Sequence, residues 1–241
     1  KKGNFSAHIH LQEIREEVTA VRNEEGLTPI QYCSKKGLFD NPTVAAHCVW
    51  IDTEDTKILS ENSVGVAHNP ISNMILASGI CPVPELRSLG INVGIGIDGA
   101  GSNDSQDMLQ SIKITPLLQR VKKMQATALS ARDAFMMATI EGAKVLGVES
   151  FLGSIELRKR ADFVILDGDS PALANIHDPF QAIVYCAGKT EVKEVWVEGE
   201  NIFKDGVITN VSKDEVVRNS KFQAVKLVKA AGLSKLSNLI N

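Results

Sequence analysis

Four apolar runs of this chain each end in side chains that can bind a metal ion or move a proton. The side chains at these ends are His8, His10 and Glu13, then His47, then His68 with Asn69, and lastly Asp98. Neutral imidazole and carboxylate groups are the usual ligands of zinc or iron in hydrolytic sites, where the metal lowers the pKa of a bound water. Catalysis then requires a further carboxylate to transfer protons. The pattern therefore predicts a hydrolytic enzyme with one divalent metal, zinc in preference to iron.

The spacing of the apolar runs indicates which elements hold these side chains. Short apolar runs alternate with helical patterns over the first two-thirds of the chain, as in repeated βα units around a parallel sheet. The predicted strands are Asn4 to Leu11, Thr43 to Val49, Ser63 to Ala67 and Asn92 to Ile97. Because side chains alternate along a strand, His8 and His10 point to the same face. Active sites of such folds lie at the C-terminal ends of the strands, so we expect the polar ends to converge.

Helical patterns fill the intervals, and the pattern changes to β-rich runs after Gly147. The predicted helices are Glu13 to Arg22, Pro29 to Gly37, Asp52 to Ser60, Val83 to Leu89, Asp104 to Lys123 and Ser130 to Leu146. The later β-rich runs are Gly153 to Leu157, Asp162 to Leu166, Ala182 to Tyr185, Val192 to Val197 and Asn201 to Lys204. An amphipathic helix, Ser212 to Ala231, follows them. We therefore predict three segments, 1–147, 148–210 and 211–241.

Composition excludes several classes of function. The 241 residues include 44% hydrophobic and 23% charged side chains with a net charge of -3, as in a soluble globular protein. Lysines and arginines form no basic stripe, so we expect no nucleic-acid partner. No apolar run approaches the roughly 20 residues of a membrane helix, so we expect a cytoplasmic protein without membrane contact. The four widely spaced cysteines predict neither disulfides nor a cysteine zinc site.

The order of the polar strand ends resembles that of a known family. The sequence is similar to the amidohydrolase superfamily, and within it to the S-adenosylhomocysteine/methylthioadenosine deaminases, the guanine and 8-oxoguanine deaminases and the triazine hydrolases. The motifs that carry this resemblance are His8-Ile9-His10-Leu11-Gln12-Glu13, Ala46-His47-Cys48, the run from His68 to Gly79, and Gly96-Ile97-Asp98-Gly99 with Ser102-Asn103. Downstream, Gly153 to Asp162 and Val197 to Gly206 resemble the closing β domain of this family.

The resemblance implies a role for each matching residue. It implies that His10 and Asp98 bind the metal, and that Asp98 also acts in catalysis. Glu13 resembles the proton-shuttling glutamate, and His47 resembles the histidine that contacts the reacting water or the substrate. The residues expected to contact the substrate are His8, His68, Asn69 and Asn73. Trp50 either lines the substrate pocket or packs under the rim of the barrel.

The resemblance also implies a part of the fold that has no counterpart here. Complete members begin with a barrel strand that ends in two metal-binding histidines, and no such strand lies upstream of His10. We therefore expect an α/β chain made of the C-terminal half of a TIM-type (β/α)8 barrel, strands 5 to 8, then strands of a small β-sandwich domain and a C-terminal helix. The expected partners are the N-terminal half of the same protein, as a separate, cleaved or unrecorded segment, and further copies in a homo-oligomer. A duplicated half barrel that closes by dimerisation is an alternative.

Together these patterns predict hydrolytic deamination of a purine-type heterocycle, with the isolated chain inactive. Val66 to Pro70 is similar to S-adenosylhomocysteine deaminases, whereas Ile75 to Pro82 and Ser102 to Asp104 are similar to 8-oxoguanine deaminases. The first cue directly follows a predicted strand and therefore favours adenosine-type substrates. One alternative is a triazine chlorohydrolase or amidohydrolase, although such enzymes can lack the Glu13 or Asp98 type of residue. Another is a non-catalytic fragment or subunit that binds no metal.

Overall fold

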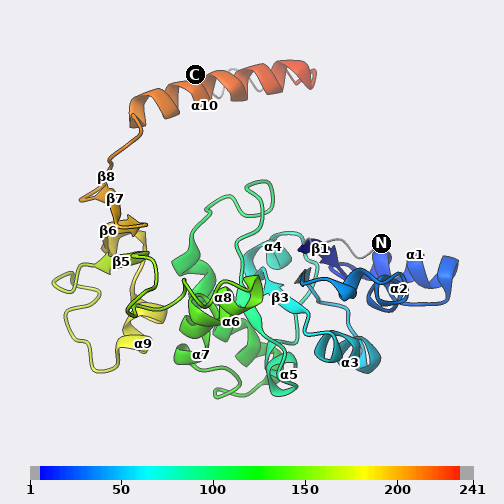
Figure 1. Cartoon of the computed structure of the whole chain (residues 1–241). Helices are drawn as coiled ribbons and strands as arrows, with labels where there is room; N and C mark the ends of the chain where they lie inside the picture. Colours follow the sequence, from blue (N-terminus) through cyan, green and yellow to red (C-terminus); the bar gives the residue numbers. More distant parts are fainter. Residues whose placement is uncertain (1–5, 234–241) are drawn as a thin grey trace. The chain divides into compact units, whose positions relative to one another are not determined.

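The computed structural model describes residues 6–233, which form two compact units (Figure 1). Among the described residues, the first contains 6–160 together with 167–191, and the second contains 161–166 together with 192–233. The predicted segment 148–210 is therefore divided between the two units. Residues 167–191 belong to the first because Val184 joins its buried core and Phe180 packs against Phe135.

A four-stranded parallel sheet forms the centre of the first unit. Its strands are β1 (Ala7–Leu11), β2 (Thr43–His47), β3 (Gly65–His68) and β4 (Val93–Ile95), in the order β1-β2-β3-β4. All neighbouring pairs are parallel, with His10 opposite Ala46 and Ala67 opposite Gly94. Each strand overlaps a predicted range, although residues 4 and 5 lie outside the described residues. Parallel pairing places the polar ends of all four strands along one edge of the sheet.

Helices and short turns connect and cover these strands. They are α1 (Arg15–Glu25), α2 (Pro29–Lys35), η1 (Leu38–Asp40), α3 (Thr53–Glu61), α4 (Pro70–Ile75), α5 (Val83–Ser88), α6 (Met108–Lys123), α7 (Ala131–Met137), α8 (Ile140–Leu146), α9 (Pro179–Gln181), η2 (Ala182–Cys186) and η3 (Lys189–Glu191). Capping boxes at Thr28, Asp52 and Ser130 start α2, α3 and α7. The helix predicted from Asp104 starts later, because Asp107 caps α6 by accepting the amide of Gln110.

One face of the parallel sheet is apolar and closely packed against helices. The buried cluster on this face includes Leu11, Ala45, Val66 and Val93 from the strands with Ile30, Leu59, Leu86, Ile112 and Met137 from the helices. Full burial of a side chain of this size stabilises the fold by about 1.5–3 kcal/mol relative to exposure. The alternation also explains why Leu11 is buried while His10, its neighbour in β1, is exposed.

The opposite face of β3 and β4 contacts α8 at glycines. A Cβ on Gly65 would lie 3.0 Å from Cγ1 of Val145, and a Cβ on Gly94 would lie 3.0 Å from Cα of Gly142. A larger residue at either position would therefore require α8 to move away by a few tenths of an ångström. To reach this face, the chain turns at Thr139, where φ is -125° and ψ is -106°. The single helix predicted for Ser130 to Leu146 is wrong for this reason.

The second unit is an antiparallel sheet followed by a helix. Its elements are β5 (Phe163–Leu166), β6 (Val192–Val197), β7 (Glu200–Lys204), β8 (Val207–Ile208) and α10 (Lys213–Ala230). The sheet order is β5-β6-β7-β8. Glu198-Gly199 and Asp205-Gly206 form its two-residue turns, and all four residues have positive φ, as tight hairpins require. The predicted Asp205-Gly206 turn and the C-terminal helix are therefore confirmed.

Two strands predicted after Gly147 are wrong. Ala182–Cys186 is helical, and it continues a turn that starts where the Asp178 carboxylate accepts the amide of Phe180. A short apolar run does not by itself distinguish a strand from a buried helical turn. Gly153 to Leu157 forms turns, and its Ile155 and Leu157 side chains are 87% and 96% exposed. Such exposed side chains give no burial that would favour an extended strand.

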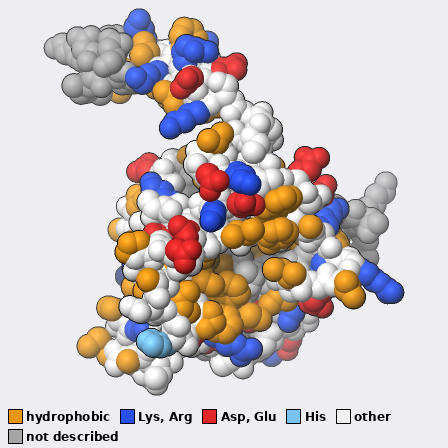
Figure 2. Space-filling view, turned by 90° about the vertical axis from the view of Figure 1, so that its left-hand side faces the viewer, with side chains coloured by type: hydrophobic (Ala, Val, Ile, Leu, Met, Phe, Trp, Pro, Cys, Tyr) orange, Lys and Arg blue, Asp and Glu red, His pale blue; other side chains and the backbone are white. Residues whose placement is uncertain are grey.

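Within the described residues, no helix combines the length and apolarity that a membrane span requires. On the face shown in Figure 2, Lys and Arg side chains are interspersed with Asp and Glu rather than gathered in one basic patch.

Candidate metal and proton-transfer site

Three predicted site residues meet where the parallel strands end. His10 lies in β1, His47 is the last residue of β2, and Asp98 follows β4. The His10 and His47 rings stack with centroids 5.3 Å apart and an interplanar angle of 22°. One ligand atom from each of the three side chains lies within 4.8 Å of the other two. The sheet thus brings together two imidazoles and a carboxylate from distant parts of the sequence.

The backbone at these strand ends adopts left-handed conformations that are uncommon for residues other than glycine. The φ angle is 52° at Gln12, 73° at His47, 46° at Cys48 and 59° at Asp98. The Cys48 amide donates to the carbonyl of Leu11 at 3.1 Å, so the turn after β2 is tied to the end of β1. Sharp turns of this kind re-aim side chains and are concentrated at functional sites.

His47 is fully buried and hydrogen-bonded in one orientation. Its Nδ1 lies 2.7 Å from Oδ1 of Asn73, an atom that only accepts, so Nδ1 donates its proton there. The other nitrogen, Nε2, has no hydrogen-bond partner among the described residues and lies 3.8 Å from Oδ2 of Asp98. A buried lone pair beside a carboxylate needs a partner, and a cation would supply one.

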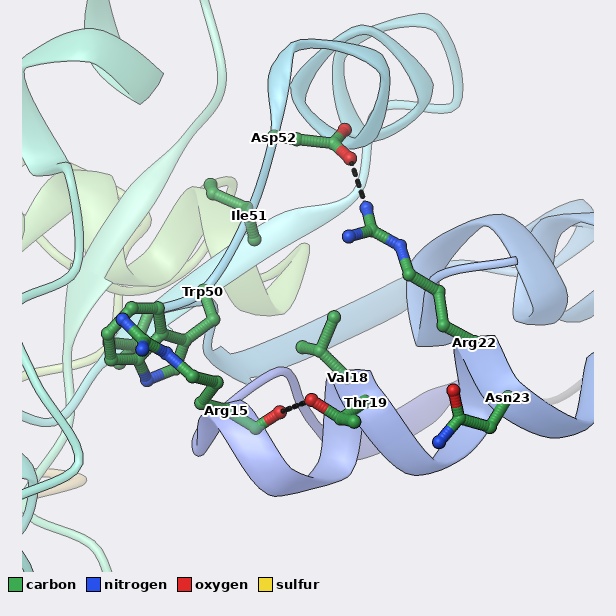
Figure 3. A pocket seen from close by; sticks show the side chains of 9 residues that line it. Arg15, Val18, Thr19, Arg22, Asn23, Trp50, Ile51 and Asp52 are labelled. Carbon is green, nitrogen blue, oxygen red and sulfur yellow. Dashed lines mark hydrogen bonds and ion pairs between the residues drawn. The ribbon is translucent and has the colours of Figure 1, made fainter. Parts of the chain in front are cut away.

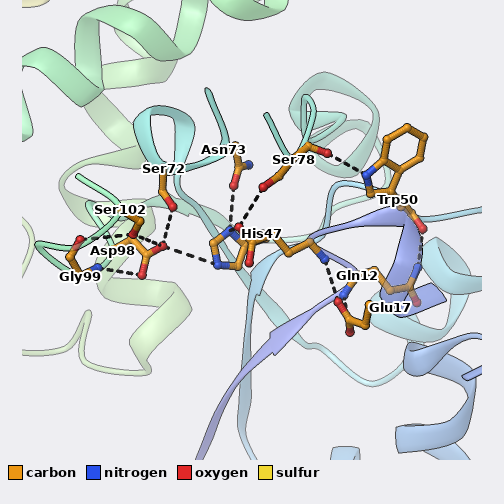
Figure 4. Close-up of polar contacts among 11 residues, drawn as sticks. Gln12, Glu17, His47, Trp50, Ser72, Asn73, Ser78, Asp98, Gly99 and Ser102 are labelled. Carbon is orange, nitrogen blue, oxygen red and sulfur yellow. Dashed lines mark hydrogen bonds and ion pairs between the residues drawn. The ribbon is translucent and has the colours of Figure 1, made fainter. Parts of the chain in front are cut away.

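Asp98 is surrounded by hydrogen-bond donors. Its Oδ2 accepts from the hydroxyls of Ser72 at 2.7 Å and Ser102 at 3.0 Å, and its Oδ1 accepts from the Gly99 amide at 2.7 Å (Figure 4). Burial raises the pKa of Asp98, but the three hydrogen bonds and the nearby His47 outweigh burial and lower it below its ordinary value. The carboxylate is therefore ionised at neutral pH.

Glu13 approaches His47 at the other ring nitrogen. Its Oε1 lies 3.7 Å from Nδ1 of His47 and accepts a hydrogen bond of 2.9 Å from the Ser78 hydroxyl. The backbone is also fixed, because the Glu17 carboxylate accepts the amides of Gln12 at 3.0 Å and Glu13 at 3.1 Å. A half-buried carboxylate with a fixed backbone and one fixed oxygen is suited to directed proton transfer.

The three clustered side chains fit a divalent metal such as zinc. Catalytic zinc sites use three protein ligands of the His and carboxylate types and leave a position open. His10, His47 and Asp98 match this number and these types, and Nε2 of His47 has no competing partner in the described part of the chain. The sequence assigned only His10 and Asp98 to the metal, so Nε2 of His47 is a third donor that the geometry adds.

Two of the predicted substrate-binding histidines lie outside this cluster. His8 is exposed on the same face of β1 as His10. His68 is fully buried, and neither ring nitrogen has a hydrogen-bond partner among the described residues. Burial, aided by the nearby His47 and Lys122, lowers the pKa of His68 to about 3. His68 is therefore neutral in the folded protein.

The two predicted substrate-binding amides are also buried. Asn69 is 5% exposed, and a Cβ on Gly96 would lie 2.2 Å from its Oδ1. Asn73 is 1% exposed, and its Oδ1 contacts His47. In this structure Asn73 therefore orients a site residue. The substrate contacts assigned to His8, His68, Asn69 and Asn73 stay predictions.

Sequence reasoning missed the side chains that orient the two carboxylates. Ser72 and Ser102 donate to Asp98, and Ser78 donates to Glu13. All three serines lie in stretches that follow strands, and that position is the signal that points to them. Because a serine hydroxyl has no periodic pattern, the sequence does not identify which acceptor it contacts.

A separate groove of about 540 Å³ lies between α1 and the loop after β2 (Figure 3). Its lining residues are Arg15, Val18, Thr19, Arg22, Asn23, Val49, Trp50, Ile51 and Asp52. The Arg15 guanidinium lies 4.4 Å from the centre of the Trp50 ring, and Arg22 pairs with Asp52 at 3.0 Å. Trp50 also donates its indole N–H to the carbonyl of Ser78 at 2.7 Å. Trp50 thus lines the groove and contacts the residue that holds Glu13.

Comparison with known proteins gives consistent matches over most of the chain. The pattern of the amidohydrolase family matches residues 1–202. A 5'-deoxyadenosine deaminase from Methanopyrus kandleri is 44% identical over 88% of this chain and 49% of its own length. The crystal structure of an adenosine deaminase from Xanthomonas campestris with bound zinc has a TM-score of 0.88 and 30% identity, covering 92% of this chain and 51% of the other.

An atrazine chlorohydrolase from Arthrobacter aurescens TC1, solved in complex with zinc, has a lower TM-score of 0.81 and 25% identity. That match covers 88% of this chain and 47% of the chlorohydrolase. The chain spans about half the length of the curated relatives that it matches.

Proposed function

Because the chain belongs to the amidohydrolase family, we propose that it supplies half of a metal-dependent enzyme that deaminates a purine-type heterocycle. The observation that carries this proposal is the convergence of His10, His47 and Asp98 within 4.8 Å, with Glu13 3.7 Å from His47. Two imidazoles, a metal-binding carboxylate and a second carboxylate are the groups that hydrolytic deamination requires.

The proposed architecture is the C-terminal half of a (β/α)8 barrel, strands 5 to 8, with a small β-sandwich domain. In the described parallel sheet, β1 and β4 are the outer strands and have one free edge each. An N-terminal half of the same protein would pair with both edges and supply the remaining metal ligands. The match to about half the length of the relatives supports this arrangement. A homo-oligomer is also proposed.

The metal-binding residues in this half are His10 and Asp98, with Nε2 of His47 as a further donor. When bound, a divalent metal supplies Lewis acidity that makes water nucleophilic near neutral pH. The zinc in the two similar solved structures supports zinc over iron. The hydrogen bond between His47 and Asn73 fixes the ring so that Nε2 is directed toward Asp98.

Glu13 is the proposed proton carrier. Attack of water on the ring carbon that bears the amino group requires a base for the first water proton. Departure of the amino group as ammonia then requires an acid. The second water proton moves from the added oxygen to the neighbouring ring nitrogen, which leaves a carbonyl in the product. Glu13 performs both tasks by accepting the first proton and donating it to the leaving nitrogen. His47 and Asp98 orient the attacking water and the developing oxygen.

An adenosine-type purine is the proposed substrate. The 5'-deoxyadenosine and adenosine deaminases among the relatives support this choice, since they are 44% and 30% identical to the chain. The atrazine chlorohydrolase is less similar, at 25%. The presence of both Glu13 and Asp98 also favours ordinary deamination over chloride displacement.

The test is release of ammonia by the complete protein. We expect ammonia from adenosine derivatives, with slower or no release from guanine, 8-oxoguanine and cytosine. The 241-residue chain alone should bind zinc weakly and release no ammonia, because the proposed N-terminal half would supply further metal ligands and cover the two free edges of the sheet. Release of chloride from a chlorotriazine, with no ammonia from any purine, would show that the proposed function is wrong.

A further inference from the structure

We infer that Ser78 and Trp50 position the catalytic carboxylate of Glu13, an inference that rests on the proposed function. We call these two residues the Glu13 clamp. The Ser78 hydroxyl donates to Oε1 of Glu13 at 2.9 Å, and the Trp50 indole N–H donates to the carbonyl of Ser78 at 2.7 Å. Figure 4 shows the hydrogen bond between Trp50 and Ser78. The clamp therefore acts on Glu13 through two consecutive hydrogen bonds.

Ser78 is placed by a turn that only glycine permits at its next position. Gly79 has φ 123°, and a Cβ there would lie 2.8 Å from Val49 and 3.6 Å from the Trp50 ring. The Ser78 amide donates to the carbonyl of Asn73 at 2.8 Å, and Ser78 is only 3% exposed. The segment from Asn73 to Ser78 therefore fixes two site residues, since Asn73 orients His47 and Ser78 orients Glu13.

Trp50 is anchored to the residue that precedes Glu13. The Trp50 amide donates to the carbonyl of Gln12 at 3.0 Å, and the Gln12 side-chain amide donates to the Trp50 carbonyl at 2.5 Å. Gln12 is itself buried, with further hydrogen bonds to Asp55 and to the amide of Ile30. The chain of contacts from Glu13 through Ser78, Trp50 and Gln12 returns to Glu13, so it forms a closed ring.

The two oxygens of the Glu13 carboxylate differ in their hydrogen bonds and therefore in their proposed roles. Oε1 accepts from Ser78, whereas Oε2 makes no hydrogen bond with the described residues. Oε2 is therefore the oxygen that exchanges protons with water and the leaving amine. Without the clamp the carboxylate rotates between several orientations, and misplacement of a reacting group by a small distance strongly lowers the rate.

A double-mutant cycle tests whether Ser78 acts through Glu13. In the complete protein, Ser78→Ala should lower kcat by about tenfold or more, with little change in KM and in metal content. In a Glu13→Gln background the same change should have almost no further effect, because the positioned group is absent. Trp50→Phe, which removes the N–H donor together with one ring of the indole, should lower kcat by a smaller factor in the same direction.

Two control variants and an NMR measurement complete the test of the Glu13 clamp. Ser111→Ala removes a buried hydroxyl on α6, and Trp196→Phe removes the other indole, so both should leave kcat unchanged. In 15N-tryptophan NMR spectra, the Trp50 indole proton should exchange slowly with solvent and shift on Ser78→Ala. Equal losses of kcat in both Glu13 backgrounds would overturn the clamp, and so would fast exchange of the Trp50 indole proton. If the wild-type protein releases no ammonia, the proposed function fails and the NMR result alone decides the clamp.

Discussion

The two ends of the site hold their carboxylates differently, although both carboxylates approach the same histidine. At one end, Asp98 receives three hydrogen bonds, which occupy both of its oxygens. At the other end, Glu13 receives one hydrogen bond on Oε1 from Ser78. A metal ligand benefits from a fixed charge, whereas a proton carrier needs one oxygen available. The difference in donors therefore supports the proposal that Asp98 binds the metal and Glu13 transfers the proton.

The largest expected effect is at the Asp98 end. Asp98→Ala should reduce both metal content and ammonia release to background, because it removes a ligand and the charge that favours a cation. Elemental analysis and an ammonia assay on the complete protein measure the two quantities. Asp104→Ala, an exposed acidic residue in the same loop, is the control and should change neither. Full metal content in Asp98→Ala would show that Asp98 is not a metal ligand, and the proposed difference between the two carboxylates would be wrong.

The next effect is at the Glu13 end. Glu13→Gln should lower kcat by about a hundredfold or more, as loss of proton transfer does, while metal content stays near that of the wild type. Glu16→Gln alters an exposed carboxylate on α1 and serves as the control. If Glu13→Gln empties the metal site instead, Glu13 belongs with Asp98 as a ligand and the comparison is wrong.

His68 sharpens the comparison because it lies near His47 and stays neutral. Its pKa is about 3 when folded and about 6.5 in an unfolded chain, so the unfolded state binds an extra proton between these values. The contribution of neutral His68 to the free energy of unfolding is therefore fully present above pH 6.5. It decreases as pH falls below this value, by up to about 1.4 kcal/mol per pH unit. Denaturation curves from pH 7 to pH 4 should show a shallower decrease in His68→Gln.

The control for this measurement is His177→Gln, which alters an exposed histidine and should keep the wild-type slope. Parallel slopes for His68→Gln and the wild type would show that His68 titrates normally in the folded protein.

The smallest effect concerns Gly96, which lies between β4 and Asp98. A Cβ at Gly96 would lie 2.2 Å from Oδ1 of Asn69, so Gly96→Ala should displace the buried Asn69 side chain next to α4, the helix that carries Ser72. We expect the free energy of unfolding to fall by about 1–3 kcal/mol, as overpacking does, with weaker metal binding. Gly101→Ala, where a Cβ meets nothing within 4 Å, should change stability much less. If Gly96→Ala is less stable but binds the metal as tightly as the wild type, the hydrogen bond from Ser72 does not contribute to metal binding by Asp98.

The sequence predicted the parts of the site that repeat a simple physical rule. Strands with alternating or continuous apolar residues are recognisable, and parallel strands must end on one edge, so the meeting of His10, His47 and Asp98 was predictable. The resemblance to the amidohydrolase superfamily is confirmed by the family match over residues 1–202. The division of roles between Glu13 and Asp98 stays a prediction.

Other features depend on contacts that a local pattern does not contain. The break at Thr139 exists because Gly142 packs against Gly94, a strand residue far away in the sequence. The helical turn at Ala182–Cys186 has the same apolar composition as a short strand. The hydroxyl of Ser78 meets Glu13 across 65 positions. In each case the deciding partner lies in another element, so only the folded arrangement identifies it.

The ring through Glu13, Ser78, Trp50 and Gln12 also has a consequence for the order of folding. It joins chain positions 38 and 65 residues apart, so β1, β2 and the segment after α4 must all be in place before it closes. Contacts between distant positions form late, because the entropy of loop closure opposes them. During refolding, helical signal should therefore return before catalytic competence, and the interval between the two reports the time that the ring takes to close.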